Sequence, residues 1–195
     1  EIGTGGGITY ESDEDFEYRE MILKSLALLN AFETEENIKM DDAISFGLGA
    51  FETINIVDGR ALFLKEHMER MDKAKEILNI KNSVDDFNVN RYIAKNHIEN
   101  AALKVILTDK NLIFEKRDNI YTTEKYLKGF EIQLSKIKRN ETSIFTYIKS
   151  LNYGDNILEK RRASREGIDE VVFLNTKGEI TEGSTTNIFL KKKKQ

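Results

Sequence analysis

The sequence contains no cysteine, no proline and no tryptophan among its 195 residues. Average usage would place roughly ten prolines in a chain of this length. Without cysteine the chain forms no disulfide, no zinc-thiolate site and no thiol nucleophile. Without proline it is neither a PxxP ligand nor a collagen-like chain. What remains is a domain that must be held together by its hydrophobic core.

Long apolar runs and a strong charge of one sign are missing as well. No run approaches the ~20 apolar residues of a membrane span, and Glu1–Thr4 show no signal-peptide pattern. The net charge of −4 argues against nucleic acid as the main partner, because such proteins need a clustered basic face. With 39% hydrophobic and 33% charged residues the composition is globular. We therefore expect a cytoplasmic protein of one or two domains.

Hydrophobic periodicity predicts the elements of the first half. A glycine-rich turn followed by a helix is expected within the first 33 residues. Residues 51–64 alternate apolar and polar side chains around Asp58-Gly59, which is typical of a β-hairpin. An apolar stripe from Leu64 to Leu78 predicts a helix, and residues 85–101 also have helical spacing.

In the second half, strands are expected at 103–108, 111–116 and 129–136, with a polar stretch at 117–126 as a candidate linker between domains. Residues 156–166 are expected to form a helix that ends at Gly167. A buried strand is expected at 171–174. A further strand should begin at Ile180 and continue through Ile188–Leu190.

Most catalytic motifs are absent. No GxSxG, GxxxxGK[ST] or GxGxxG segment and no metal-ligand spacing is present, so no metal site is expected. The two histidines, His67 and His97, are expected to be packing or surface residues. Two features remain as candidates for chemistry.

The first candidate is Lys149, which follows the largely apolar run Phe145–Ile148. A lysine at the end of a buried strand is desolvated, which lowers the pKa of its amine and lets the neutral amine attack a carbonyl. The second candidate is the segment Glu182–Asn187, in which a glycine and three hydroxyl residues could present hydrogen-bond donors to a phosphate. Taken alone, the first feature is more simply explained as a surface lysine and the second as a polar β-turn.

Several segments together resemble the class IV, pyridoxal-phosphate-dependent aminotransferases. This family includes branched-chain and D-amino-acid aminotransferases and aminodeoxychorismate lyase. The resemblance covers roughly residues 40–190 in the family's order. It is carried by Phe46–Thr53, Asp58-Gly59, Glu66–Met71, Lys149 with Asn152-Tyr153, Gly167–Val171 and Thr181–Phe189.

The resemblance implies a two-domain α+β fold, fold type IV of the pyridoxal phosphate enzymes. It implies a small α/β N-terminal domain at 34–120 and the first part of a β-rich, cofactor-binding C-terminal domain at 121–195. It also implies pyridoxal 5′-phosphate as cofactor, a small-molecule substrate and a homodimer.

The resemblance further implies roles for individual residues. Lys149 would be the Schiff-base lysine and proton carrier, and Glu182 would pair with the pyridine nitrogen. Arg70 would bind the cofactor phosphate through a bidentate fork, and Tyr153 would lie near the cofactor's phenolic oxygen. Ser184 and Thr185 would lie at the phosphate-side loop. Phe46 and Phe51 would line the substrate side.

Residues 1–33 carry a second resemblance, to the C-terminal end of chorismate-utilising enzymes such as aminodeoxychorismate synthase component I. The matching residues are Gly3–Thr9, Ser12-Asp13, Glu17–Glu20 and Lys24. Glu14 stands where that family usually has proline. The residue matching Glu20 is a magnesium ligand there, but the rest of that domain is absent, so no chorismate chemistry is expected from this segment.

This juxtaposition favours a bifunctional folate-pathway protein, in which the class IV domain converts aminodeoxychorismate to p-aminobenzoate and pyruvate. Two alternatives remain open. One is a branched-chain or D-amino-acid aminotransferase, which shares the cofactor and its binding residues. The other is a non-catalytic fragment, because class IV C-terminal domains continue well past the segment that matches Glu182–Asn187.

Overall fold

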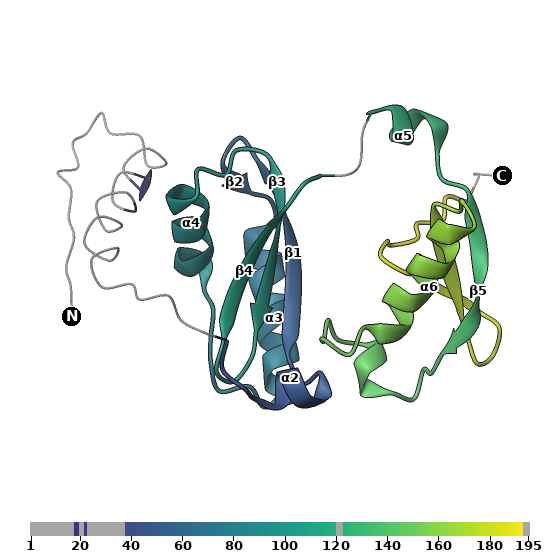
Figure 1. Cartoon of the computed structure of the whole chain (residues 1–195), viewed down its shortest axis with the longest axis horizontal. Helices are drawn as coiled ribbons and strands as arrows, with labels where there is room; N and C mark the ends of the chain where they lie inside the picture. Colours follow the sequence, from purple (N-terminus) through teal and green to yellow (C-terminus); the bar gives the residue numbers. More distant parts are fainter. Residues whose placement is uncertain (1–17, 20–21, 23–37, 120–122, 193–195) are drawn as a thin grey trace. The chain divides into compact units, whose positions relative to one another are not determined.

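The computed structural model describes residues 18, 19, 22, 38–119 and 123–192. The chain forms two compact units, unit 1 (Glu1–Asn119) and unit 2 (Ile120–Gln195) (Figure 1). The division lies next to the boundary expected at residue 120. The expected synthase-like remnant at 1–33, including Glu20, lies almost entirely outside the described residues.

Unit 1 contains a four-stranded antiparallel sheet with the order β2-β1-β3-β4. The predicted hairpin is confirmed, because β1 (Ala50–Val57) and β2 (Arg60–Ala61) are joined by Asp58 and Gly59, both with positive φ. β3 (Ala101–Leu107) pairs with β1, and β4 (Leu112–Arg117) pairs with β3.

One face of this sheet forms the core of unit 1. Alternate residues of β1 and β3 are buried and pair across the two strands, for example Ile54 with Leu103. The predicted helix α3 (Leu64–Leu78) packs on β1 with Met68, Met71 and Ala74 buried (Figure 1). The apolar spacing therefore identified both the helix and the face that it buries.

α4 (Asp86–Lys95) is shorter than the helix expected at 85–101. A capping box between Asp85 and Asn88 starts it. Beyond Lys95 the chain turns at His97, whose φ is +49°, and enters β3. Tyr92 of α4 stacks on Phe114 of β4 with ring centroids 4.6 Å apart, which ties the helix to the sheet.

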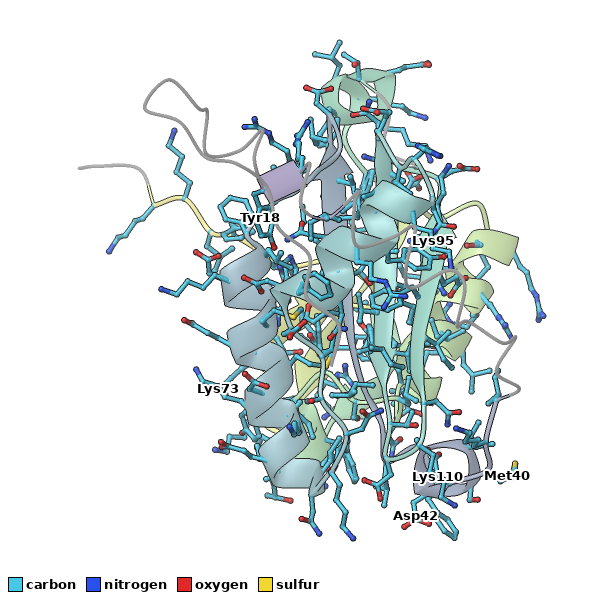
Figure 2. The ribbon with its side chains drawn as sticks, turned by 90° about the vertical axis from the view of Figure 1, so that its left-hand side faces the viewer. Tyr18, Met40, Asp42, Lys73, Lys95 and Lys110 are labelled. Atoms are coloured by element: carbon cyan, nitrogen blue, oxygen red, sulfur yellow. The ribbon has the colours of Figure 1, made fainter. Side chains whose placement is uncertain are left out.

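The short helix α2 (Asp42–Phe46) is held at the end of the sheet by Asp41. The Asp41 carboxylate caps α2 and also accepts hydrogen bonds from Thr108 and from the backbone of Lys110. The Lys110 ammonium donates to the Met40 carbonyl at 3.0 Å, and Met40, Asp42 and Lys110 lie together at this end (Figure 2).

Unit 2 contains a three-stranded sheet with the order β5-β6-β7. β5 (Ile132–Arg139) and β6 (Glu170–Asn175) are parallel, and β6 and β7 (Ile180–Gly183) are antiparallel. The crossover between β5 and β6 contains the 3-10 helix η1 (Ile144–Thr146) and the helix α6 (Gly154–Arg165), which packs on both strands. The chain thus builds an α+β fold in each unit.

The stretch 117–126, expected as a linker between domains, contains the division between the two units, and α5 (Thr123–Lys128) begins within it. Two other sequence expectations in unit 2 are wrong. The apolar run before Lys149 forms η1 and an irregular segment instead of a strand. Residues 188–190 are not a strand, and Phe189 and Leu190 are almost fully exposed. Local apolar content misled in the last two cases because no neighbouring strand pairs with those segments within the described residues.

Candidate active site

Glu182 lies in β7 and is paired with Arg139 at the end of β5. The Arg139 Nη2 atom donates to Glu182 Oε1 at 2.5 Å, and the guanidinium also lies 4.8 Å from the Phe173 ring centroid. The Arg139 side chain is 15% exposed, whereas that of Glu182 is 38% exposed. Arg139 therefore fixes one oxygen of a carboxylate whose side chain still reaches solvent.

Tyr153 begins α6 and bonds to the loop after β7. Its hydroxyl donates to the Ser184 carbonyl at 2.8 Å, and the Asn156 amide donates to the same oxygen at 2.8 Å. Burial and the neighbouring Glu182 carboxylate raise the pKa of Tyr153 above its ordinary value. The phenol therefore stays protonated, close enough to Glu182 to sense its charge.

Lys149 lies just before the fully buried Ser150, in the segment that leads to Tyr153 and α6. Its side chain is half-buried. The irregular backbone here replaces the predicted strand, but the lysine is still partly desolvated. The amine thus lies on the same segment as Tyr153, four residues ahead of it.

Three buried polar atoms in this part of unit 2 have no hydrogen-bond partner: Arg139 Nε, Ser150 Oγ and Asn156 Oδ1. Arg139 binds Glu182, Asn156 binds the Ser184 carbonyl, and Ser150 follows Lys149 in the sequence. Buried polar atoms without a partner are costly and rare in folded proteins. A polar ring system held by an amine and a carboxylate therefore fits this donor and acceptor set.

The donors of Ser184 and Thr185 are bound by a carboxylate of the chain itself. Glu170, at the start of β6, accepts from the Ser184 hydroxyl and from the backbone N–H groups of Ser184 and Thr185 at 3.2 and 3.3 Å. The Thr185 hydroxyl and the Lys160 ammonium, at 3.0 and 3.6 Å, complete its shell. The donors that were expected to face a phosphate therefore bind the Glu170 carboxylate in this structure.

Burial raises the pKa of Glu170, but the hydrogen bonds from Ser184 and Val171 and the charge of Lys160 lower it below its ordinary value. Glu170 therefore stays ionised and ties the loop after β7 to β6. Glu170 lies within Gly167–Val171, one of the segments that resemble the class IV family, but the resemblance implied no role for it. An acidic residue at the start of an otherwise apolar strand was the available signal.

Arg70 lies on α3 in unit 1 and binds a second buried carboxylate. Glu52 of β1 is fully buried, and it accepts from Arg70 Nε and Nη2, both at 2.5 Å. His67 Nδ1 lies 2.8 Å from the same carboxylate, so this histidine is a packing residue with a defined partner. Burial raises the pKa of Glu52, but the hydrogen bonds from Arg70 and His67 bring it below its ordinary value.

The two phenylalanines expected on the substrate side differ in exposure. Phe46, at the end of α2, is 69% exposed, whereas Phe51 in β1 is 7% exposed. The Phe51 ring lies beneath the Lys104 ammonium at 4.8 Å. Phe46 therefore offers a surface to a ligand, and Phe51 offers very little.

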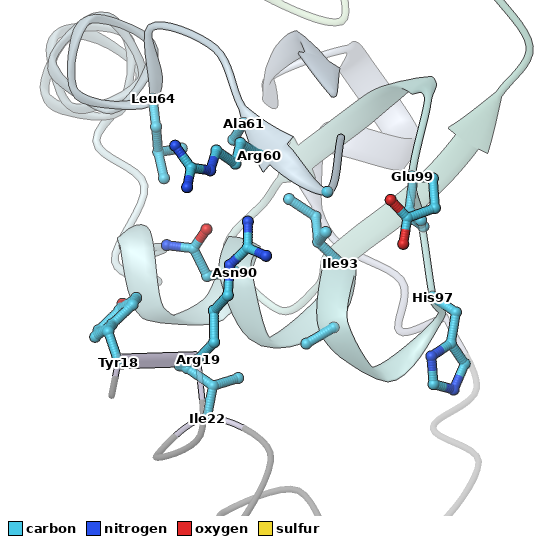
Figure 3. Close-up of a pocket in the computed structure, with 13 residues that line it drawn as sticks. Tyr18, Arg19, Ile22, Arg60, Ala61, Leu64, Asn90, Ile93, His97 and Glu99 are labelled. Atoms are coloured by element: carbon cyan, nitrogen blue, oxygen red, sulfur yellow. The ribbon is translucent and has the colours of Figure 1, made fainter. Parts of the chain in front are cut away.

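A cavity of about 490 Å³ lies in unit 1 (Figure 3), and Arg70 is not among the residues that line it. Arg19 and Ile22 line it from one side and Arg60, Asn90 and Ile93 from the other. His97, expected to be a packing or surface residue, lies at its edge and is exposed. Within the described part of the chain, no group of three or more acidic or histidine side chains is arranged to hold a metal ion.

The model of the amino-transferase class IV family matches residues 49–195. The chain belongs to the class IV aminotransferase family. Its members are pyridoxal phosphate enzymes, and Lys149, Tyr153 and Glu182 all lie within the matched region. Arg70 also lies within it.

Class IV proteins with different activities resemble the chain to a similar degree. It is 26% identical to aminodeoxychorismate lyase from Bacillus subtilis over 78% of its length. It is 29% identical to a putative branched-chain-amino-acid aminotransferase from Methanocaldococcus jannaschii, also over 78%. The chain covers 58% and 59% of these two relatives, about three fifths of their length.

The class IV fold is shared with a solved structure of a putative 4-amino-4-deoxychorismate lyase from Legionella pneumophila. The two chains superimpose with a TM-score of 0.65 over 78% of this chain and 62% of the other, at 21% identity. The α+β fold of the fold-type IV pyridoxal phosphate enzymes is thereby confirmed. No helix in the described residues is long and apolar enough to cross a membrane.

Proposed function

We propose that the chain acts as a pyridoxal-phosphate-dependent 4-amino-4-deoxychorismate lyase, which releases pyruvate and leaves p-aminobenzoate. The observation that supports the pyridoxal phosphate chemistry common to this proposal and its alternative is the polar cluster of unit 2. This set contains the half-buried Lys149, the protonated Tyr153, the Arg139-bound Glu182 and three buried polar atoms without a hydrogen-bond partner. Such a set matches a ring that carries a basic nitrogen and a phenolic oxygen.

Each of the three residues in unit 2 has a separate role in the proposed reaction. When bound, the cofactor supplies an electron sink for the substrate's α-carbon. Lys149 would hold the cofactor through its amine and would move the proton at the substrate's α-carbon. Glu182, fixed by Arg139, would accept a hydrogen bond from the protonated ring nitrogen. The proposal assigns Tyr153 to the phenolic oxygen.

The choice of lyase over aminotransferase rests on two similarities. The Bacillus subtilis relative and the Legionella structure are both named as lyases, and residues 1–33 resemble the end of an aminodeoxychorismate synthase component I. The competing proposal, a branched-chain or D-amino-acid aminotransferase, is supported by the 29% identity to the Methanocaldococcus protein. The proton transfer by Lys149 is common to both, so the cluster itself does not choose between them.

Covalent labelling tests whether Lys149 holds the cofactor. The full chain is incubated with pyridoxal 5′-phosphate, reduced with borohydride and digested, and the peptides are weighed by mass spectrometry. We expect the reduced adduct on Lys149 and its loss in Lys149→Ala, while Lys177→Ala in the turn before β7 keeps it. An unlabelled Lys149 in the wild-type chain would contradict both proposals and support a non-catalytic role.

Pyruvate release separates the two activities. The lyase should release pyruvate from 4-amino-4-deoxychorismate without any keto-acid acceptor. Strict dependence of turnover on an acceptor would instead establish the aminotransferase. We also propose that the protein works as a homodimer, which sedimentation of the cofactor-loaded chain measures directly.

A further inference from the structure

A carboxylate in the core of unit 1 needs an explanation. Glu52 lies on the face of β1 that packs under α3, in register with the buried Val105 of β3, and its side chain is 0% exposed. The residues of the same parity in β1, Ala50, Ile54 and Ile56, are apolar and buried. Replacing a buried ion pair by apolar groups is often neutral or stabilising, so stability alone does not account for this charge.

The carboxylate is bound along one edge of the Arg70 guanidinium. Glu52 Oε1 accepts from Nε and Oε2 accepts from Nη2, which is the side-on fork of an arginine–carboxylate pair. The other edge, formed by Nη1 and the second hydrogen of Nη2, has no acceptor among the described residues of the chain. The Arg70 side chain is 49% exposed, so this end-on edge can be reached from solvent.

His67 is the second side chain that binds the Glu52 carboxylate. Because Glu52 is ionised, its oxygens only accept, and the 2.8 Å contact to His67 Nδ1 requires the proton on Nδ1. A histidine with Nδ1–H cannot accept from Arg70, although Nη2 lies 3.3 Å away. His67 therefore donates to Glu52 and does not accept a hydrogen bond from the end-on edge of Arg70.

We propose that Glu52 is a positioning residue, which holds the Arg70 guanidinium so that its end-on edge binds two oxygens of a phosphate group. An arginine held by one edge has lost most of its rotamer freedom before the ligand arrives, so binding a second oxyanion costs less entropy. The inference rests on the proposed function in one respect, because it takes this phosphate to be that of pyridoxal 5′-phosphate. Glu52 had no role assigned from the sequence, although it lies within the segment Phe46–Thr53.

The positioning is measured without any activity, by NMR of the side-chain nitrogens of ¹⁵N-arginine in the full chain. Held at one edge, Arg70 should show separate Nη signals, and titration with inorganic phosphate should move them. In Glu52→Gln the Nη signals should merge, and the same phosphate concentration should move them several-fold less. Glu69→Gln, an exposed carboxylate beside Arg70 on α3, is the matched control and should behave like the wild-type chain.

Two results would overturn the inference. One is a phosphate response in Glu52→Gln as large as in the wild-type chain. The other is a wild-type Arg70 that ignores phosphate, or that responds equally to acetate. If Glu52→Gln does not fold by circular dichroism, Glu52→Asp replaces it, because it keeps the charge but withdraws the carboxylate by one methylene. Glu52→Asp should then give a partial loss, and a full wild-type response would also contradict the inference.

Cofactor binding ties the inference to the proposed function. Pyridoxal 5′-phosphate should bind Glu52→Gln roughly 10-fold more weakly than the wild-type chain, as expected for a damaged charged hydrogen-bond pair. Pyridoxal, which has no phosphate, should bind both chains equally. Equal weakening for both ligands would contradict the role of Glu52. A wild-type chain that binds neither ligand would contradict the proposed function, and the phosphate titration would still decide the inference.

Discussion

The two units are stabilised in different ways. In unit 1, β1, β3, α3 and α4 bury a continuous set of aliphatic side chains, among them Ile54, Leu103 and Met71. In the described part of unit 2, the buried apolar side chains are Ala163, Val171, Val172 and Phe173. Ile132, Leu134 and Ile180 of its sheet are more than half exposed. Unit 2 therefore depends less on apolar burial than unit 1.

What unit 2 has instead is a pair of buried carboxylates that each join several segments. Glu159 of α6 accepts from Arg162, from the Ser135 hydroxyl and from the Lys136 N–H, so it fastens α6 to β5. Glu170 fastens the loop after β7 to β6. Unit 2, which contains the proposed catalytic residues, is therefore held together largely by polar bonds to carboxylates, whose strength depends on pH. Unit 1 is held together mainly by the burial of apolar side chains.

The largest effect is expected from a cavity in unit 1. Leu103→Ala removes a fully buried side chain at the centre of the sheet and should cost about 2–5 kcal/mol of the free energy of unfolding of that unit. The loss should be the same at pH 4 and pH 7, because no titrating group is involved. Urea unfolding with hydrogen exchange read separately on peptides of each unit measures it. A loss below about 1 kcal/mol would show that unit 1 does not depend on this core.

A buried carboxylate in unit 2 gives the next effect, and it should depend on pH. The hydrogen bond from Arg162 lowers the pKa of Glu159, and burial raises it. With the hydrogen bonds from Ser135 and Lys136, the pKa falls from 4.5 to about 2. The unfolded chain therefore binds this proton at a higher pH than the folded unit does. The stabilisation is complete above about pH 4.5 and is lost as the pH falls toward 2.

Glu159→Gln should accordingly destabilise unit 2 by about 3 kcal/mol at pH 7, and the difference from the wild-type chain should shrink toward pH 2. The Glu159 side chain is only 6% exposed, so solvent screening reduces this little. Glu166→Gln is the matched control, because Glu166 also bonds Arg162, at 3.0 Å, but is 44% exposed. If both variants lost the same free energy, burial would not be the origin of the effect.

These contrasts also explain what could be predicted from the sequence. The hairpin, α3 and the strands of unit 1 follow from apolar periodicity and from Asp58-Gly59, because a core formed from neighbouring segments leaves a local pattern. In unit 2 the same reasoning failed for the segment before Lys149 and for 188–190. Those segments are apolar but pair with no strand in the described residues, so local apolar content was a false signal there.

The candidate site shows the same division. Lys149, Tyr153 and Glu182 could be proposed as site residues from a family resemblance. Arg139 and Glu170 could not be assigned from the sequence, because each acts through a partner more than ten residues away. Glu52 did leave a signal. It shares the parity of Ile54 and Ile56, so a strand that buries these isoleucines must bury the carboxylate too.

A third effect is expected where β7 leaves the sheet. A Cβ atom added at Gly183 would lie 2.1 Å from the Thr186 hydroxyl oxygen and 2.9 Å from the Thr186 carbonyl oxygen, so the turn would have to open. Gly183→Ala should destabilise unit 2 by about 1–3 kcal/mol and weaken labelling of Lys149 by pyridoxal phosphate, since Glu182 would shift. Gly154→Ala is the control, because nothing lies within 4 Å of a Cβ there. A Gly183→Ala chain as stable as the wild type would mean that the close approach to Thr186 is dispensable.

The smallest effect tests whether burial or distance decides the strength of an ion pair. On β4 of unit 1, Arg117 Nη2 donates to Glu115 Oε2 at 2.7 Å, shorter than the 3.0 Å between Arg162 and Glu159. Both side chains of the β4 pair are nearly half exposed, however. Glu115→Gln should therefore cost less than about 0.5 kcal/mol, and 1 M salt should abolish even that. A loss comparable to that of Glu159→Gln would mean that short surface pairs stabilise unit 1 as strongly as buried carboxylates stabilise unit 2, and the contrast between the units would then lie in their apolar cores alone.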